Sequence, residues 1–486
     1  MKRFWIISLF LVFVASSYAQ GDYEAFRFSQ IDYMGTARYM GAGGTFGTVG
    51  GDFSGLFTNP AAIGLYKRHE VSFTPMMISF FKDNTLYNGT NSYTQNPKYT
   101  VPECGLVITS PIVRDSEWKY WQFGFGYNRI MDYNNTFRAV GTPNTSFINP
   151  ILSRANGINY QQLSADAMIA WNTWLIDTFP GQSANYFSPF SDANLDQSTL
   201  VKQTGSIDEM SFTFGGNYND KLFLGLSVGI PFLDYQEQTI LNEDRSYEGY
   251  LTGNTSDSIT SYKVKTTQRD RGAGINAKIG IIYQPVNFLR LSAAIQTPSY
   301  FWKIKDYYNR DITSYSINGQ TYNHEYTYNY QFALSTPFRF NLGTAFLINK
   351  RAFISAEYEF NDYRMATLYA NDYDFSNENA LTREKYNACH TIRIGGEVNL
   401  SPSFALRAGY NFKTSPYANS DQWSEGFNGS AHYGSFGFGY RAKYFFVDLA
   451  YIVKFSKDSY NLYTPNATAQ VKNTTHRVAA TIGCKF

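Results

Sequence analysis

The residue types that most often carry out chemistry in proteins do not assemble into a recognisable site in this sequence. Its 486 residues include five histidines and three cysteines, and neither set shows the close spacing that metal ligands need. The histidines are His69, His324, His390, His432 and His476, and the cysteines are Cys104, Cys389 and Cys484. No Gly-x-Ser-x-Gly motif is present to place a nucleophile on a sharp turn. We therefore expect no enzyme, no metal site and no cofactor.

A glycine-rich stretch near the N-terminus contains Gly41, Gly43, Gly44 and Gly47. A phosphate-binding loop would follow such glycines with a lysine and would join a strand to a helix. No lysine follows here, and the flanks show neither pattern, so we exclude nucleotide binding. The formal charge of +2 gives no reason to expect a nucleic-acid partner.

Charged residues recur on one face of several segments in which polar and apolar positions alternate. A turn centred on Pro402 would set Glu397 directly opposite Arg407, within cross-strand contact. Two interpretations remain open: paired charges that fill a polar interior, or a charged path for a substrate. The residues concerned are Arg339, Glu357, Glu359, Arg393, Glu397 and Arg407.

The segments that must position these side chains alternate in the manner of β-strands. The chain holds 40 tyrosines and 40 phenylalanines, interspersed with glycine, serine, asparagine and charged residues. In LFLGLSVGIPF, residues 222–232, large apolar side chains occupy one face, and glycine, serine and one phenylalanine occupy the other. Segments of about ten residues with this alternation are typical of transmembrane β-barrels, whose strands face lipid on one side and a polar interior on the other.

We expect about 14 strands, an even number that lets an antiparallel barrel close with both termini on one side of the membrane. Short connections alternate with longer polar ones, as they do in the barrel proteins of the Gram-negative outer membrane. Phe486 would end the last strand facing lipid, and it resembles the signal that directs barrels into that membrane. The expected strands lie near 70–82, 99–112, 117–133, 206–218, 221–241, 259–283, 287–306, 323–348, 351–368, 384–400, 403–416, 429–442, 443–460 and 472–486.

Two segments fall outside this strand pattern. Lys2 and Arg3 precede a short apolar run that leads to Ala19, so we expect residues 1–19 to be a cleaved secretory signal. The widest connection, 134–205, is expected to be a long extracellular loop containing a helix over 159–179.

The helix prediction rests on apolar side chains at helical spacing, ended by Pro180 and Gly181. This apolar stripe either packs on neighbouring loops or captures an apolar ligand. For capture we single out Met168, Trp171, Trp174, Leu175 and Phe179.

Residues 20–69 separate the signal from the first strand and end in Asn59, Pro60, Ala61 and Ala62 after a glycine-rich run. This order of features, followed by about 14 strands and a terminal phenylalanine, resembles the FadL-type outer-membrane transporters of hydrophobic compounds. The resemblance implies that residues 20–69 form a hatch folded inside a barrel made by residues 70–486. Glycine permits tight turns in a crowded lumen, and Pro60 restricts both itself and Asn59.

The resemblance also implies that the third strand bends inward and opens the wall sideways, with Gly124 and Gly126 able to take the kink. The function implied is passive, hatch-gated uptake of long-chain fatty acids or other hydrophobic small molecules, released laterally into the membrane. The partners would then be the hydrophobic ligand and outer-membrane lipid. The alternative is a barrel subunit that contacts other outer-membrane proteins in a secretion or assembly complex, as some members of the family do.

Overall fold

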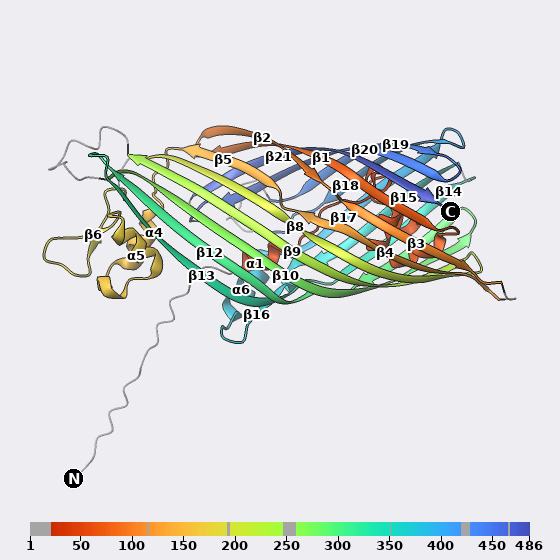
Figure 1. Ribbon diagram of the computed structural model, residues 1–486, viewed down its shortest axis with the longest axis horizontal. Helices are drawn as coiled ribbons and strands as arrows, with labels where there is room; N and C mark the ends of the chain where they lie inside the picture. Colours follow the sequence, from red (N-terminus) through yellow and green to blue (C-terminus); the bar gives the residue numbers. More distant parts are fainter. Residues whose placement is uncertain are drawn as a thin grey trace, which may run out of the picture.

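The first strand of the chain is hydrogen-bonded to the last, so the sheet closes into an antiparallel barrel (Figure 1). The computed structural model describes residues 21–113, 116–191, 195–245, 259–349, 351–418, 428–464 and 467–486. Within these residues the barrel has 14 strands, as the sequence predicts. The expected signal peptide lies outside the described residues.

Nine of the 14 barrel strands are continuous, and five are built from two segments each. The single strands are β1 (Glu70–Tyr87), β8 (Leu195–Tyr218), β9 (Leu222–Arg245), β10 (Ile259–Val286), β17 (Ala388–Asn399), β18 (Phe404–Lys413), β19 (Ala431–Arg441), β20 (Phe445–Asn461) and β21 (Thr468–Lys485). The paired segments are β2 (Thr90–Thr100) with β3 (Glu103–Pro111), β4 (Trp118–Asp132) with β5 (Asn135–Gly141), β11 (Leu289–Gln296) with β12 (Tyr300–Ser316), β13 (Thr321–Ser335) with β14 (Arg339–Ile348), and β15 (Ala352–Asp362) with β16 (Thr367–Tyr369).

The two ends of the barrel differ (Figure 1). One end carries short turns and the C-terminus; the other carries the connection between β5 and β8, with α4 (Ile148–Ala155), η3 (Tyr160–Gln162), α5 (Ala165–Asn172) and the small hairpin of β6 (Asp177–Thr178) and β7 (Tyr186–Phe187). The wall is also uneven, since β10 has 28 residues and β18 has 10. About 10 residues cross the hydrocarbon, so the β8–β10 side extends well above it.

Large apolar side chains cover the outer face of the barrel. Leu226 on β9, Ile279 on β10 and Ile295 on β11 are about half exposed, and they lie side by side across the ladders. Such a continuous apolar surface is costly in water and stable in lipid. None of the helices among the described residues is long and apolar enough to span a membrane.

The lumen at the short-turn end is filled by the N-terminal segment, residues 21–66, which we call the plug (Figure 1). Its elements are α1 (Asp22–Arg27), α2 (Ala37–Gly41), α3 (Phe46–Val49), η1 (Phe53–Phe57) and η2 (Pro60–Leu65). The η2 helix packs on β4, β8, β9 and β10, α3 on β11, β14 and β15, and α2 on β18 to β21. The plug therefore contacts the wall on nearly every side.

The first hairpin is longer than the sequence predicts. We expected a loop over 83–98, whereas β1 and β2 continue through it to a two-residue turn at Asn88 and Gly89. Both turn residues have positive φ, the geometry that Asn-Gly favours between paired strands. The Asn-Gly pair was therefore the available signal, while the polar residues around it lack the apolar alternation of a lipid-facing strand.

The helix expected over 159–179 is shorter than predicted. Instead of one helix over 159–179, only η3 and α5 are helical, and α4 was not foreseen. The helix ends because Trp174 takes a left-handed conformation (φ 58°), which lets the backbone amide of Leu175 donate to Ala170 at 2.9 Å. That reversal buries Leu175 against the rest of the loop, which outweighs continuation of the helix.

Candidate functional site

The plug contacts the barrel through glycines that face the lumen. A β-carbon added at Gly225 would lie 2.2 Å from the carbonyl carbon of Pro60, and one added at Gly409 would lie 2.2 Å from the amide of Gly43. Only glycine permits backbones to approach this closely. We call these residues the lumen glycines. They occur on nine of the described strands: Gly105, Gly126, Gly215, Gly225, Gly280, Gly343, Gly395, Gly409 and Gly437.

The Asn59-Pro60-Ala61-Ala62 segment is held by one of these contacts. The Asn59 side chain accepts a hydrogen bond from the amide of Ala61 at 3.0 Å and donates one to the carbonyl of Ile281 at 3.4 Å. It thereby caps η2, with Pro60 in the first turn, where the missing amide proton costs nothing. Ala61 and Ala62 are fully buried. The segment thus packs closely against β9 and β10.

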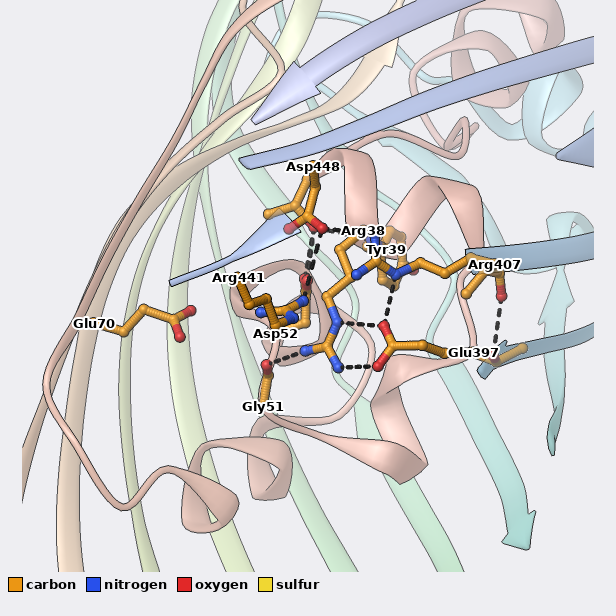
Figure 2. A network of polar contacts seen from close by, with 12 residues as sticks. Arg38, Tyr39, Gly51, Asp52, Glu70, Glu397, Arg407, Arg441 and Asp448 are labelled. Atoms are coloured by element: carbon orange, nitrogen blue, oxygen red, sulfur yellow. Dashed lines mark hydrogen bonds and ion pairs between the residues drawn. The ribbon is translucent and has the colours of Figure 1, made fainter. Parts of the chain in front are cut away.

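An ion-pair network fixes the opposite side of the plug (Figure 2). The Arg38 guanidinium donates two hydrogen bonds of 2.9 Å to Glu397 on β17 and one of 2.7 Å to the carbonyl of Gly51. Glu397 also accepts from Arg407 at 2.6 Å, and Arg407 pairs with Asp448 at 2.6 Å. The expected register of Glu397 opposite Arg407 is confirmed. We call this set the Arg38 network.

A buried carboxyl lies beside the network. Thr36 donates to both oxygens of Asp52, at 2.8 and 2.9 Å. Burial raises the pKa of Asp52 to about 6, although Arg38 and Thr36 act in the opposite direction. Because this pKa is higher in the packed plug than in water, ionisation of Asp52 costs the packed state free energy. That cost is full above about pH 6, decreases as the pH falls below 6, and is gone below the ordinary pKa of an aspartate.

A second ion pair lies further along the plug. Asp32 pairs with Arg477 on β21 and accepts a hydrogen bond of 2.9 Å from the Tyr433 hydroxyl. Burial opposes its ionisation, but Arg477 and Lys454 outweigh burial and hold the pKa of Asp32 below its ordinary value. These two ion pairs lie on β17 to β21, and a third joins Arg27 of the plug to Glu237 on β9 at 3.4 Å. The η1 and η2 helices meet β3 to β10 mainly through apolar and backbone contacts.

The remaining lumen charges also have partners. Glu359 pairs with Arg393 at 2.5 Å, Glu357 accepts from the backbone amide of Thr48 at 2.9 Å, and Arg339 donates to the carbonyl of Ser29 at 2.9 Å. These contacts favour the interpretation in which paired charges fill a polar interior.

The cavity above the plug is about 70 Å³. Two of the residues that line it, Asn128 and Ile130, belong to β4. A water molecule occupies about 30 Å³ in the liquid, so this cavity holds a few waters and no long acyl chain. Passage of a larger molecule requires movement of the plug or the wall.

The wall itself is interrupted between its second and third strands. The β3–β4 ladder ends at Glu103 and Asn128, after which β2 pairs only with β1 and β5 only with β8. Side chains bridge the interval, as where Asn96 donates to the carbonyl of Thr136 at 3.1 Å. We call this interval the β2–β5 seam. It begins at the residue of β4 that borders the lumen cavity.

Gly124 and Gly126, expected to kink the third strand, do not interrupt it. Gly124 pairs with Val107 and Thr213, in unbroken ladders on both sides. Both glycines face the plug, where a β-carbon at Gly126 would lie 2.3 Å from the ring of Phe53. Their small size therefore admits the plug, and the irregularity lies beyond Asn128.

The five residues expected to capture a ligand do not share one surface. Leu175 is fully buried, and Met168 and Trp171 are partly buried in the loop core, where Trp171 packs on Tyr160 and Tyr186. Trp174 and Phe179 are 53% and 42% exposed. Phe486 is exposed at the end of the barrel, and its backbone exchanges hydrogen bonds with His69.

A closed antiparallel barrel with its own N-terminal segment in the lumen defines the class of plugged outer-membrane barrels. Within that class, the sequence model of the outer membrane protein transport proteins (OMPP1/FadL/TodX) matches residues 194–486. The chain belongs to this family. Its members are outer-membrane channels for hydrophobic compounds in Gram-negative bacteria, and the family is a transport family. The resemblance noted in the sequence and the expected location are confirmed.

Solved structures share the fold. A FadL homologue of Pseudomonas aeruginosa superposes with a TM-score of 0.56 at 13% identity, covering 94% of this chain and 99% of that one. The toluene transporter TodX of P. putida gives 0.54 at 13% identity with the same coverage. The CymD monoaromatic hydrocarbon channel gives 0.50 at 12% identity, also covering 94% and 99%. Comparison with curated protein sequences gives no match.

The first prediction concerns the lumen glycines. In Gly225→Val the added β-carbon meets plug backbone, and overpacking of this kind costs about 1–3 kcal/mol. The plug should be displaced, so single-channel conductance in planar bilayers should rise several-fold. Gly434→Val is the matched control, because its β-carbon meets only Val453 at 3.6 Å. Equal conductance in the two folded variants contradicts close packing of the plug.

The second prediction concerns the Arg38 network. In a variant lacking the native cysteines, Ala61→Cys should react slowly with a periplasmic thiol reagent, since Ala61 is fully buried. Adding Arg38→Met leaves Glu397 without one partner, at a cost of about 3–5 kcal/mol, and labelling should accelerate by more than about tenfold. The control is Lys67→Met, which removes an exposed ion pair with Asp220. Fast labelling before Arg38 is changed rules out a sealed plug.

Proposed function

We propose that this protein is a passive channel that takes up long-chain fatty acids or other hydrophobic small molecules and releases them sideways into the outer membrane. The β2–β5 seam is the observation that carries this proposal. It is an interval of the wall without a backbone ladder, and it begins where the lumen cavity reaches β4. Separating β2 from β5 there breaks side-chain bridges and leaves every backbone ladder intact.

Release through the side of the barrel is consistent with a lumen that is closed at its short-turn end. The lumen glycines and the Arg38 network seal the short-turn end, and the charges there are costly for an apolar molecule to pass. Transfer of an acyl chain into lipid releases about 0.8 kcal/mol per CH₂ group. The bilayer beside the seam therefore supplies the driving force, and the plug has to shift only enough to enlarge the cavity.

The chemical class of the ligand follows from the family and from the names of the structural relatives. TodX is a toluene transporter and CymD a monoaromatic hydrocarbon channel. Both act on apolar molecules, which is the property we transfer to this chain. Uptake assays with a radiolabelled fatty acid and with toluene in parallel distinguish an aliphatic from an aromatic preference.

The alternative function, a barrel subunit that contacts other outer-membrane proteins, is favoured by one observation. The extracellular loop exposes Ile158, Tyr160, Trp174, Phe179 and Phe187. An exposed apolar surface of this kind serves either as a first contact for an apolar ligand or as a protein interface.

The third prediction separates these uses through two tryptophans of the loop. Trp174→Ala removes an exposed ring that lies 6.4 Å from Tyr322, so uptake of labelled ligand should fall while the loop stays folded. Trp171→Ala removes a packed ring, at a cost of about 3–5 kcal/mol, and should make the loop sensitive to protease. Parental uptake in Trp174→Ala, together with loss of a protein from pull-downs, would assign the surface to a partner.

The fourth prediction tests the seam directly. With the native cysteines replaced, Asn96→Cys and Thr136→Cys place thiols at positions that are already bridged across the seam. Oxidation should stop uptake, and a reductant should restore it. Met77→Cys with Thr100→Cys is the control, because these positions are paired in the continuous β1–β2 ladder. Full uptake with the seam locked excludes the lateral route and leaves hydrophobic transport itself standing.

A further inference from the structure

Three of the five histidines lie on the outer face of the barrel in the same local arrangement. His390 on β17, His432 on β19 and His476 on β21 each have Nδ1 2.7 Å from the hydroxyl of a tyrosine on the preceding barrel strand. The tyrosines are Tyr358 on β15, Tyr410 on β18 and Tyr451 on β20. We call these the Tyr–His pairs. Among the described residues, these pairs recur along one continuous side of the barrel.

The Tyr–His pairs lie at one height. His390 precedes the last residue of β17, Asn399, by nine positions. His432 precedes Arg441 and His476 precedes Lys485 by the same nine. Nine residues rise about 30 Å along a strand, and a tilt of 35–45° reduces this to about 21–25 Å of membrane depth. The apolar band of an outer-membrane barrel is about 25 Å tall, so the pairs mark its outer edge.

The side chains below and above this level agree with that placement. Below it, the outward positions are apolar, for example Ile394, Phe436 and Ile482. Above it, Lys457 and Lys472 are exposed and directly opposite each other in the β20–β21 ladder. Lys472 lies four residues outward of His476, about 10 Å further from the membrane centre on a tilted strand.

A third cation completes the group. Lys82 faces outward on β1 opposite Thr474, two residues from Lys472. The three lysines lie at the level of lipid headgroups, in which phosphate is the common anion.

The hydrogen bond to tyrosine orients each histidine as a hydrogen-bond donor to groups outside the barrel. The phenol can donate its proton to Nδ1, and a neutral imidazole then carries its own proton on Nε2. That proton can be donated to an acceptor outside the barrel. The lysines of β20, β21 and β1 lie above His476 and beside His432, and His390 lies at the same height on β17. Three such donors at the membrane edge match phosphate oxygens that lie at the level of the headgroups.

We propose that the outer face of β17 to β21 and β1 binds the phosphate groups of an anionic lipid in the outer leaflet. The lipid fixes the depth of the barrel in the membrane on this side. The site consists of His390, His432 and His476, oriented by their tyrosines, with Lys82, Lys457 and Lys472.

The test measures the phosphate-bearing lipid that co-purifies with each folded barrel, by native mass spectrometry and phosphate analysis after extraction in mild detergent. The His390→Phe, His432→Phe, His476→Phe variant and the Lys82→Gln, Lys457→Gln, Lys472→Gln variant should each lose bound lipid several-fold. Replacing the three tyrosines with phenylalanine keeps the rings and should give an intermediate loss. His324→Phe on β13 is the matched control and should retain the parental amount.

Heat-modifiable migration reports folding in each case. If a triple variant fails to fold, His432→Phe and Lys472→Gln singly carry the test, and each should lower the lipid content. Parental lipid content in every folded variant overturns the proposal. Binding of inorganic phosphate by the delipidated barrel as strongly as of the lipid overturns it too, because the site would then recognise a free anion.

Discussion

The barrel wall and the plug approach each other so closely that only glycine fits on the wall side. At eight of the nine lumen glycines, an added β-carbon would lie within 2.3 Å of an atom of the plug. The polar backbone of the plug thus lies against the polar backbone and paired charges of the wall, and a cavity of about 70 Å³ lies between them. Passage of a long acyl chain through this cavity requires the plug or the wall to change position.

The forces that hold the plug differ around the barrel. On β17 to β21 they include the ion pairs of Arg38 with Glu397 and of Asp32 with Arg477. Breaking such a pair leaves a buried charge and costs about 3–5 kcal/mol. On β3 to β10 the contacts are largely apolar, through residues such as Phe53 and Ile63. One ion pair, between Arg27 and Glu237 on β9, also joins the plug to the wall on this side, at 3.4 Å. The β2–β5 seam lies on the same side of the barrel.

The outer surface is matched to the membrane in a comparable way. β17, β18 and β19 have 12, 10 and 11 residues and are close to the minimum length for crossing hydrocarbon, whereas β8 to β10 continue far beyond it. Two of the Tyr–His pairs involve these short strands, and the third lies on β20 and β21. All three pairs lie nine residues above the short-turn end.

The sequence by itself determined the barrel, its strand number and the register of one hairpin. Alternation with a period of two residues is a local property of a strand that meets lipid on one face, so it can be counted along the chain. The direct pairing of Glu397 with Arg407 followed from one short turn. The plug followed from the glycine-rich segment ending in Asn59-Pro60-Ala61-Ala62, through its resemblance to a known family.

Only the tertiary structure decided where the wall is interrupted, what the lumen glycines do and which loop side chains are exposed. The sequence does not show whether Gly124 and Gly126 bend their strand or make room for the plug. That outcome depends on plug residues more than sixty positions away, such as Phe53 beside Gly126. Leu175 and Trp174 are neighbours in the chain, yet one is buried and the other exposed, since Trp174 takes a left-handed conformation just after the helix ends. Such outcomes depend on contacts between distant segments, and the pattern of a single strand or helix does not contain them.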